Sequence, residues 1–460
     1  MLERDSLTVF SKWNIPDIGA DMRRYISILS IFLLGCFSAY AQNQSAERYV
    51  VLISIDAFKP EFYLDSNWYA PTLKRLMREG VCAEGVKPVF PSVTYPNHIS
   101  MITGVLPDKH GIFYNSPPQG SKRWNATMIK APTIFDAVHA SGRTTSALFW
   151  PVTAESSIQY NVPTAPGMKR MKAAGFKSVD FMNSTASPGL WEELEQNVIG
   201  KVRVADIDSD VNTGKMAAYI IRTHKPALTA IHLTGIDHAQ HKVGMENQSI
   251  SEALLIIDQA IQEIIVAIEQ AGITANTTLL IAGDHGFSDV NLSLAPNVWL
   301  KKKGLYRNAN RWKAKFYTSN GAAFLYLRDK NDDRTLRRVM RMLDNLPDDE
   351  KKMFRVINRD ELHTLGADPD ALLALNPVRG IVLRKRGSGK LVRHATGGAH
   401  GYFADFPEVM TGFVGWGNGL NAGVVIPHMN VPDIAPIIAR LLELDFESQD
   451  GQVNEELFKN

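Results

Sequence analysis

Short apolar runs alternate with stretches of helical periodicity along most of the chain. The apolar runs are rich in β-branched residues and bounded by turn residues, which predicts buried strands at 49–55, 81–88, 144–149, 227–233, 277–282 and 410–414. Helical patterns separate them, at 71–79, 133–140, 214–223, 249–271 and 431–444. The longest of these places its apolar residues on one helical face: Leu254, Ile257, Ile261, Ile264, Ile265 and Ile268. Strands that alternate with helices predict an α/β fold with a mainly parallel central sheet flanked by helices.

Two stretches interrupt this alternation. Residues 151–212 are rich in Pro, Gly, Ser and Met, and residues 301–395 hold short strand-like pieces and an Arg-rich helix near 334–343. No linker between them is convincing enough to divide the chain. The sequence therefore predicts a single domain over 42–460, with both stretches as insertions that cap the functional end of the sheet.

The N-terminal region carries an export signal. An arginine pair, Arg23-Arg24, precedes an apolar run over 25–37, and Ala39-Tyr40-Ala41 then offers a small-residue cleavage site. The run is shorter than the roughly 20 residues that span a bilayer, so no transmembrane segment is expected in the mature chain. The sequence predicts a signal peptide region over 1–41, with Met22 as an alternative start, and a periplasmic or secreted product.

The two cysteines leave a second interpretation of this region open. Leu33-Leu34-Gly35-Cys36 resembles a lipoprotein box in which Cys36 would be lipidated, although leucine before the glycine is a weak match. Either route leaves Cys82 as the only thiol of the mature chain. No disulfide within that chain is then expected, and stability must come from the core and from bound metals.

Composition narrows the class of ligand. The chain has 45% apolar and 21% charged residues, which is ordinary for a globular protein. Its formal net charge of +2 provides no broad basic field for a nucleic-acid duplex, because affinity for such a polyanion comes from clustered Lys and Arg. Any nucleotide bound by this chain is expected to be small.

Acidic residues follow three of the predicted strands. Asp56 comes directly after the first strand, Asp284-His285 follow the fifth, and Asp237 lies shortly after the fourth. Ligands of open α/β sheets bind beyond the carboxyl ends of the strands, so these side chains should converge on one crevice. One Asp after a strand is also a common turn or helix-capping residue, but three such residues, two of them with a nearby His, favour a site.

The spacing of carboxylates and imidazoles favours metal binding. Asp237 and His241 are four residues apart, which places both on one face of a helical turn and suits two ligands of one ion. Asp284 and His285 add an oxygen and a nitrogen, and His400 adds an imidazole between glycines. Oxygen and nitrogen ligands without thiolates favour zinc at a catalytic site, with manganese and iron as alternatives.

Thr94 is a candidate nucleophile. It precedes an expected helix, whose free N–H groups and dipole favour phosphate, and a divalent ion can activate a hydroxyl that is otherwise too weakly acidic to attack. Taken alone, Thr94 is better explained as a helix N-cap. His98 is expected to be structural, and His238 to be a solvated neighbour of the metal ligands.

As an ordered set, these residues resemble the nucleotide pyrophosphatase/phosphodiesterase family of the alkaline phosphatase superfamily. The matching motifs are Asp56, Thr94-Tyr-Pro-Asn-His98, Asn115, Asp237-x-x-x-His241, Asp284-His285-Gly286 and His400-Gly-Tyr402. The resemblance spans roughly residues 48–445 and implies an alkaline-phosphatase-like fold. Each motif alone is weak evidence, whereas the set is specific.

The resemblance also implies a ligand set and a mechanism. It assigns one zinc to Asp237, His241 and His400, and a second zinc to Asp56, Asp284, His285 and the Thr94 oxygen. Thr94 would attack phosphorus to form a phospho-threonine, which water then hydrolyses. Asn115 would donate a hydrogen bond to a phosphoryl oxygen, and Tyr95 would stack on a nucleobase, unless it is only a core or lid aromatic.

The substrate class is a small phosphodiester or nucleotide. The stretch 147–152 has no Lys-x-Arg clamp of the kind that helps to bind a monoester dianion, and it resembles the Phe-Trp-Pro region of diesterases. Two residues depart from the family pattern, His232 for a tyrosine and Gln240 for a glycine, and the first of these weakens the expectation of a nucleobase sandwich. A phospholipid-headgroup diesterase, a phosphomonoesterase, a phosphonate hydrolase and a non-catalytic periplasmic binding protein are the alternatives.

Overall fold

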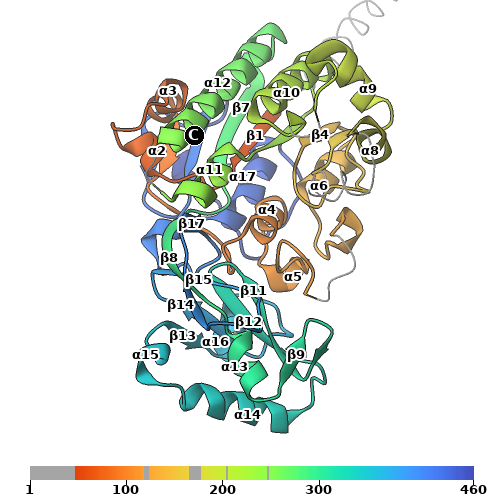
Figure 1. The fold of residues 1–460 in the computed structure, drawn as a ribbon. Helices are drawn as coiled ribbons and strands as arrows, with labels where there is room; N and C mark the ends of the chain where they lie inside the picture. The colour runs from red at the N-terminus through yellow and green to blue at the C-terminus, as the bar shows by residue number, and fades with distance from the viewer. Residues whose placement is uncertain (1–46, 119–123, 165–177, 204–205, 246–247, 460) are drawn as a thin grey trace, which may run out of the picture. The chain divides into compact units, whose positions relative to one another are not determined.

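The central element is an eight-stranded sheet with the order β19-β2-β18-β7-β1-β6-β4-β5. The computed structural model describes residues 47–118, 124–164, 178–203, 206–245 and 248–459, and Arg48–Asn460 forms one unit (Figure 1). The signal region 1–41, Met22 and Cys36 lie outside the described residues. Within the described residues, no helix is both long and apolar enough to span a membrane.

The middle of the sheet is parallel. β1 (Tyr49–Ile55) pairs in parallel with β6 (Leu228–Leu233) on one side and β7 (Thr277–Gly283) on the other. β4 (Thr145–Leu148) extends the parallel part beyond β6. All residues of these four strands are buried, as expected for strands that are covered on both faces. The predicted α/β fold with a mainly parallel sheet is confirmed.

Helices cover both faces of the sheet. Val51, Ile53 and Ile55 of β1 pack into the core beneath α3 (Pro71–Glu79), α10 (Asp210–His224) and α12 (Gln248–Gln270). Val50 and Leu52 point to the opposite core, which is covered by α4 (Thr94–Thr103), α6 (Ile134–Ala140) and α17 (Ile434–Leu441). In Figure 1, α10 and α12 lie in front of β1 and β7. This alternation along one strand is the two-residue period of a β-strand.

Some predicted elements end at other residues or are divided. The apolar run at 410–414 becomes β18 (Phe413–Gly417), which is antiparallel to β7 and to β2 (Val81–Ala83). The strand expected at 81–88 is two strands, β2 and β3 (Val86–Lys87), because the chain leaves the sheet at Glu84 and Gly85. The helix expected at 431–444 begins as a 3₁₀ turn over Val431–Asp433 and continues as α17.

Part of the range 151–212 belongs to the main sheet. β5 (Tyr160–Val162) is its edge strand and pairs with β4 in parallel. The range continues with α8 (Ser178–Thr185), α9 (Leu190–Leu194) and a π-helical turn over Glu195–Ile199. β5 has only three residues, and a strand this short in a polar, Pro- and Gly-rich stretch produces no recognisable apolar periodicity.

The range 301–395 builds a second, antiparallel sheet with its own core. Its strand order is β11-β12-β14-β13, and it is accompanied by α14, the Arg-rich helix predicted near 334–343. The bounds are β11 (Ala314–Ser319), β12 (Ala322–Leu327), β13 (Phe354–Ile357), β14 (Ala374–Pro377) and α14 (Asp333–Asp344). β8 (Ser288–Leu294), just after β7, pairs with β15 (Gly380–Leu383), β16 (Val392–His394) and β17 (Gly398–Ala399).

The remaining elements are short. The helices are α2 (Glu61–Leu64), α5 (Pro107–His110), α11 (Gly235–Val243), α13 (Asn297–Lys302), α15 (Asp348–Lys351) and α16 (Arg359–Thr364). The strands are β9 (Tyr306–Asn308), β10 (Arg311–Trp312), β19 (Val424–Ile426) and β20 (Met429–Asn430). Single 3₁₀ turns cover Ala126–Met128, Thr274–Asn276, Pro407–Val409 and Glu455–Leu457.

Candidate active site

Three neighbouring strands position the acidic residues of the candidate site. In the register of the sheet, Ile55 of β1 lies opposite Leu233 of β6 and Gly283 of β7, so the three strands end at the same level. Asp56 and Asp284 follow directly, and β6 leads into α11, which carries Asp237. The predicted convergence of acidic side chains at the carboxyl ends of these strands is what the structure shows.

Asp56, Asp284 and His285 form the first group. The His285 Nε2 atom lies 3.2 Å from Asp56 Oδ1 and 3.3 Å from Asp284 Oδ2. The other carboxylate oxygen of Asp284 accepts hydrogen bonds from the backbone N–H groups of Ala57 and His285. His285 donates its Nδ1 proton to the carbonyl oxygen of Gly286, 3.0 Å away, which leaves Nε2 free to act as a ligand.

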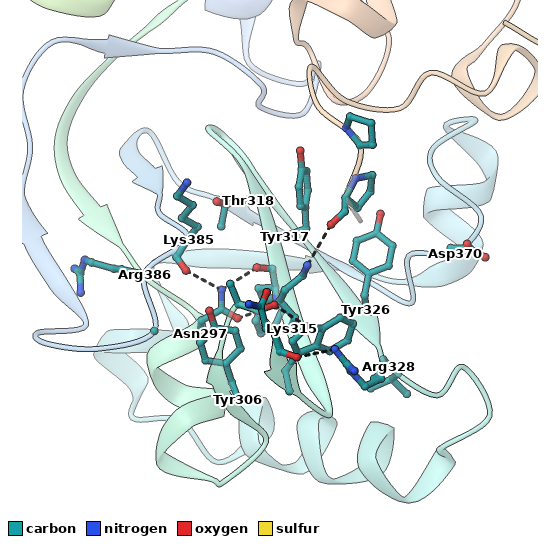
Figure 2. Close-up of a pocket in the computed structure, with 18 of the residues that line it drawn as sticks. Asn297, Tyr306, Lys315, Tyr317, Thr318, Tyr326, Arg328, Asp370, Lys385 and Arg386 are labelled. Carbon is teal, nitrogen blue, oxygen red and sulfur yellow. Dashed lines mark hydrogen bonds between the residues drawn. The ribbon is translucent and has the colours of Figure 1, made fainter. Parts of the chain in front are cut away.

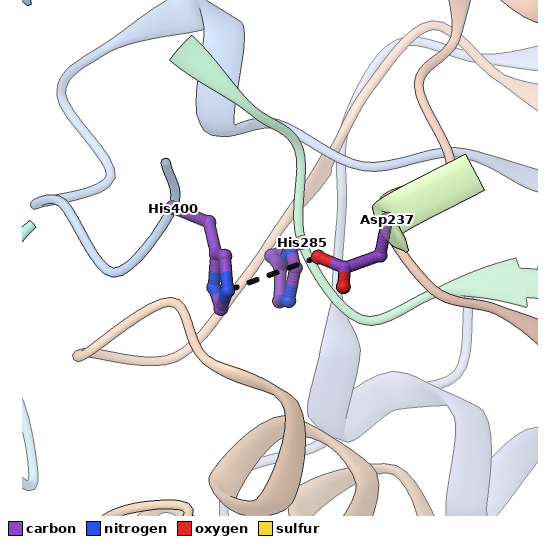
Figure 3. Close-up of side chains that lie close together, drawn as sticks. All are labelled: Asp237, His285 and His400. Atoms are coloured by element: carbon purple, nitrogen blue, oxygen red, sulfur yellow. Dashed lines mark ion pairs between the residues drawn. The ribbon is translucent and has the colours of Figure 1, made fainter. Parts of the chain in front are cut away.

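Asp237, His241 and His400 form the second group. Asp237 Oδ1 lies 3.3 Å from His241 Nε2, one helical turn further along α11, and 3.8 Å from His400 Nε2. His400 donates Nδ1–H to the carbonyl oxygen of Ser92 at 3.0 Å, which directs Nε2 toward the carboxylate. Figure 3 shows Asp237 and His400 joined in this way beside His285.

His285 connects the two groups. Its ring stacks on that of His400 with centroids 3.8 Å apart and an interplanar angle of 8°. Potential ligand atoms gather in two overlapping sets, Asp56 with Asp284 and His285, and Asp237 with His285 and His400. His241, which the sequence assigns to the second group, reaches Asp237 but is outside these tightest sets, and its side chain is 37% exposed.

Thr94 lies at the start of α4 beside Asn115. Its side chain is not an N-cap, because the cap residue is Val93 in extended conformation, so the N-cap interpretation is wrong. The Asn115 Nδ2 group donates toward Thr94 Oγ1 at 3.4 Å, and Asn115 Oδ1 accepts the backbone N–H of Tyr95 at 2.9 Å. The Tyr95 contact fixes the orientation of the amide, so its N–H group faces the threonine hydroxyl.

Burial sets the electrostatics of the site. Desolvation raises the pKa of Asp56 well above its ordinary value, and the nearby charge of Asp237 raises it further, while a hydrogen bond from Thr94 opposes this shift. Desolvation, followed by the charge of Asp56, likewise raises the pKa of Asp284. Burial lowers the pKa of His285 well below its ordinary value and that of His400 to about 4. A bound cation would keep these buried carboxylates ionised, and neutral imidazoles are the form that binds metal ions.

Several buried polar atoms in the site have no hydrogen-bond partner. They are Asp56 Oδ1, Asp284 Oδ2, Asp237 Oδ1 and His285 Nε2. Such atoms cost free energy unless they are satisfied, and all four point into the two groups above. Carboxylate oxygens and imidazole nitrogens in this arrangement fit divalent metal ions of the zinc class.

Two buried histidines lie behind the candidate ligands. His232 Nε2 is 3.2 Å from Asp56 Oδ2, and His98 Nδ1 is 3.6 Å from Asp284 Oδ2 and 2.8 Å from the carbonyl oxygen of Thr94. The sequence marks His98 as structural and His232 only as a departure from the family pattern, so their contacts with Asp284 and Asp56 were missed. For His232, the signal in the sequence was a histidine inside an otherwise apolar strand. His238 is exposed, as predicted.

Comparison with known proteins decides the family. The family model described as type I phosphodiesterase / nucleotide pyrophosphatase matches residues 50–403. The chain belongs to this family. The match includes every residue of the candidate site, and the predicted resemblance is confirmed. The description of the family is that of hydrolases that act on phosphodiester and pyrophosphate bonds.

Curated relatives and solved structures agree with this family. Bis(5'-adenosyl)-triphosphatase ENPP4 of Homo sapiens is 25% identical over 252 residues, 52% of this chain and 47% of that protein. Human ectonucleotide pyrophosphatase/phosphodiesterase family member 1 is 21% identical over 427 residues, 87% of this chain and 40% of that protein. The chain thus spans less than half the length of these relatives. The structure of human ectonucleotide pyrophosphatase/phosphodiesterase 5 superposes with a TM-score of 0.64 at 18% identity, covering 88% and 97% of the two chains.

Proposed function

We propose that this type I phosphodiesterase cleaves phosphodiester or pyrophosphate bonds of small nucleotides, with Thr94 as nucleophile and two zinc ions as cofactors. The observation that carries the proposal is the position of Thr94. Its hydroxyl lies at the N-terminal end of α4, faces the Asn115 amide and is close enough to Asp56 to lower the pKa of that carboxyl. The names of the relatives, a bis(5'-adenosyl)-triphosphatase and an ectonucleotide pyrophosphatase, support nucleotides as substrates.

The candidate ligands divide into two sites. Asp237, His241 and His400 would hold one ion, and Asp56, Asp284, His285 and the Thr94 hydroxyl oxygen would hold the other. Paired divalent ions supply charge stabilisation for the entering and departing oxygens of an in-line displacement. The ordered tautomers of His285 and His400, each fixed by a backbone carbonyl, support these assignments.

The chain's own residues carry the displacement. The Thr94 oxygen attacks phosphorus and its proton passes to solvent, while the bond from phosphorus to the departing oxygen breaks and that oxygen keeps the electron pair and takes up a proton from solvent. Water then attacks the phospho-threonine, and the Thr94 oxygen leaves and regains a proton. Asn115, held by the Tyr95 backbone, donates to a phosphoryl oxygen whose charge grows in the transition state.

The Asn115 amide is a neutral donor, which favours a diester substrate over a monoester. A monoester dianion gains from additional cationic groups, whereas a diester monoanion is stabilised by the Asn115 amide and the metals. The half-buried Tyr95, next to the nucleophile, is placed to stack on a nucleobase. A phosphomonoesterase, a phosphonate hydrolase or a phospholipid-headgroup diesterase on the same scaffold would show a different ranking of substrates.

Export completes the proposal. The N-terminal segment with Arg23-Arg24 and its apolar run would direct the chain to the periplasm or the medium, with lipidation at Cys36 as the alternative. The range 301–395 would shape access to the site, because it ends next to β17 and His400. A mature N-terminus after Ala41, determined by sequencing the exported protein, would support cleavage by signal peptidase.

The Thr94→Ala variant tests the proposal. We expect hydrolysis of bis-p-nitrophenyl phosphate by zinc-loaded protein to fall by several orders of magnitude, with the metal retained by Asp56, Asp284 and His285. Wild-type protein should turn over this diester faster than p-nitrophenyl phosphate. A much better rate with the monoester would show that the substrate class is wrong, and undiminished activity of Thr94→Ala would favour a binding protein with a contaminating hydrolase.

A further inference from the structure

A large cavity lies beside the loop that carries Asn115. Its volume is about 1170 Å³, which is sufficient for a nucleotide, and its walls come from residues 116–118 and from segments within 297–387 (Figure 2). The metal ligands and Thr94 are not among its lining residues. The cavity is therefore a separate space from the candidate active site.

The lining carries an excess of positive charge. Its charged residues are Lys315, Arg328, Lys330, Lys385, Arg386 and Asp370. Asp370 already pairs with Lys330, with Nζ and Oδ1 2.6 Å apart. In the part of the chain that the structure describes, the other four cations have no ion pair with a carboxylate. The net charge of the whole chain is only +2, yet several cations without an acidic partner line this one cavity. Such a concentration of positive charge attracts anions.

Backbone carbonyls hold two of these cations, Lys315 and Arg328, close to each other. Arg328 donates to the Asn310 carbonyl oxygen at 2.8 Å, and Lys315 donates to that of Pro118 at 3.2 Å. Both lie over the Trp312 ring, at 5.2 and 4.9 Å from its centroid. Burial, followed by the charge of Arg328, lowers the pKa of Lys315. An anionic ligand would relieve this repulsion.

Aromatic surface lies next to these charges. Tyr306, Tyr317 and Tyr326 line the cavity together with Trp312, and Figure 2 shows Tyr317 and Tyr326 side by side. A planar base gains from contact with such rings, and its phosphates gain from the lysines and arginines. The combination suits a nucleotide better than an inorganic ion.

The cavity contacts both sides of Asn115. Ahead of it, Tyr114 shares a hydrogen bond of 2.8 Å between its hydroxyl and that of Tyr326. Behind it, the carbonyl oxygen of Ser116 accepts the Tyr317 hydroxyl at 2.7 Å. The residue that faces Thr94 is thus fixed between two residues that touch the cavity wall.

We propose that this cavity binds the leaving group of a long substrate, one that carries further phosphates and a base beyond the bond that is cleaved. The inference rests on the proposed function of Thr94. A phosphate held between Thr94 and Asn115 can direct one substituent along Ser116 toward the cavity, where its negative charge meets Lys315, Arg328 and Lys385. The enzyme then favours nucleoside polyphosphate leaving groups over short neutral ones.

Lys385 is the residue of choice for a test. Its ammonium group has no hydrogen bond or ion pair within the described residues, and its side chain is exposed to the cavity and solvent, so substitution does not disturb the fold. The variants Lys385→Gln and Lys385→Glu remove and reverse the charge. Lys302→Glu is the matched control, because Lys302 is exposed on nearby α13 and does not line the cavity.

The measurement is the ratio of kcat/KM for diadenosine triphosphate to kcat/KM for bis-p-nitrophenyl phosphate, which carries no further phosphate and no base. We expect this ratio to fall about tenfold in Lys385→Gln and further in Lys385→Glu, and to stay constant in Lys302→Glu. Added salt should lower the ratio in wild-type protein more than in Lys385→Gln.

The possible failures are distinguishable. If Lys385→Glu leaves the ratio unchanged while both substrates are hydrolysed, the leaving-group site is overturned and the function of Thr94 stands. If the wild-type protein hydrolyses neither substrate with metals bound, the proposed function fails and the inference falls with it.

Discussion

The ring of His285 stacks on the ring of His400, with centroids 3.8 Å apart, and thereby joins two groups of candidate ligands from distant parts of the chain. His285 follows β7 and contacts Asp56, whereas His400 follows β17 and contacts Asp237. Loss of either ring is therefore expected to affect both candidate metal sites.

Metal content tests this coupling. His285→Ala should lower the zinc bound per chain at both sites, because it removes one ligand and the surface on which His400 rests. His241→Ala should affect only the Asp237 site, since His241 contacts Asp237 and is partly exposed. Elemental analysis after dialysis measures both variants, with His238→Ala as the control on the same helix. Equal losses in His285→Ala and His241→Ala would contradict the coupling.

Removal of the Asn115 amide should slow the chemical step. Asn115→Ala loses the donor that faces Thr94, and comparable donors contribute about 10²–10³-fold to kcat. We expect kcat for bis-p-nitrophenyl phosphate to fall within that range, with a smaller change in KM. Ser116→Ala in the same loop should retain activity. A change confined to KM would place Asn115 in substrate binding only.

His232 is expected to act through Asp56. Its Nε2 atom faces Asp56 Oδ2, and its Nδ1 atom lies 3.2 Å from the Phe149 carbonyl oxygen, so the imidazole orients a candidate ligand from behind. His232→Leu should weaken zinc affinity by roughly 10–100-fold, as is typical for such supporting residues. Competition with a chromogenic chelator measures this affinity. Unchanged affinity in folded His232→Leu protein would show that His232 only fills the core.

His110 provides a pH-dependent contribution to stability. Burial lowers its pKa to about 3, whereas the unfolded chain has an ordinary histidine pKa near 6.5. Its stabilising effect is present above about pH 6.5 and is lost as the pH falls toward 3, because the unfolded state binds the proton first.

His110→Gln isolates this effect. Between pH 5.5 and 4.5, the free energy of unfolding should decrease by up to about 1.4 kcal/mol more in wild-type protein than in the variant. Urea titrations at the two pH values measure the difference, and the other buried histidines cancel in the comparison. Parallel pH dependences would show that His110 does not titrate as its burial implies.

Local patterns predicted much of the fold. The bounds of β1 and α3 follow from apolar periodicity and a proline at the helix start, and α12 follows from its long apolar face. The antiparallel direction of β18 and the edge position of β5 depend on which strands meet in space, which periodicity does not record. The second sheet over 301–395 was likewise recognised only as a break in the pattern.

Part of the candidate site was predictable because several of its acidic residues follow apolar strands. Asp56 and Asp284 stand at strand ends, and the helical spacing of Asp237 and His241 is visible in the sequence, while their grouping into two sites came from the family resemblance. The contacts of His98 and His232 were not predictable, because they arise between β6 and α4, which are distant in sequence. The cavity beside Asn115 was missed because its lysines, arginines and aromatic residues are scattered over segments without a motif.

The stereochemical course at phosphorus tests the central claim most directly. Attack by Thr94 followed by attack of water comprises two in-line displacements, each of which inverts the configuration. Hydrolysis of a chiral phosphorothioate nucleotide diester in isotopically labelled water should therefore give a product with net retention of configuration. Net inversion would contradict the account, because it would show that water displaces the leaving group without a threonine intermediate.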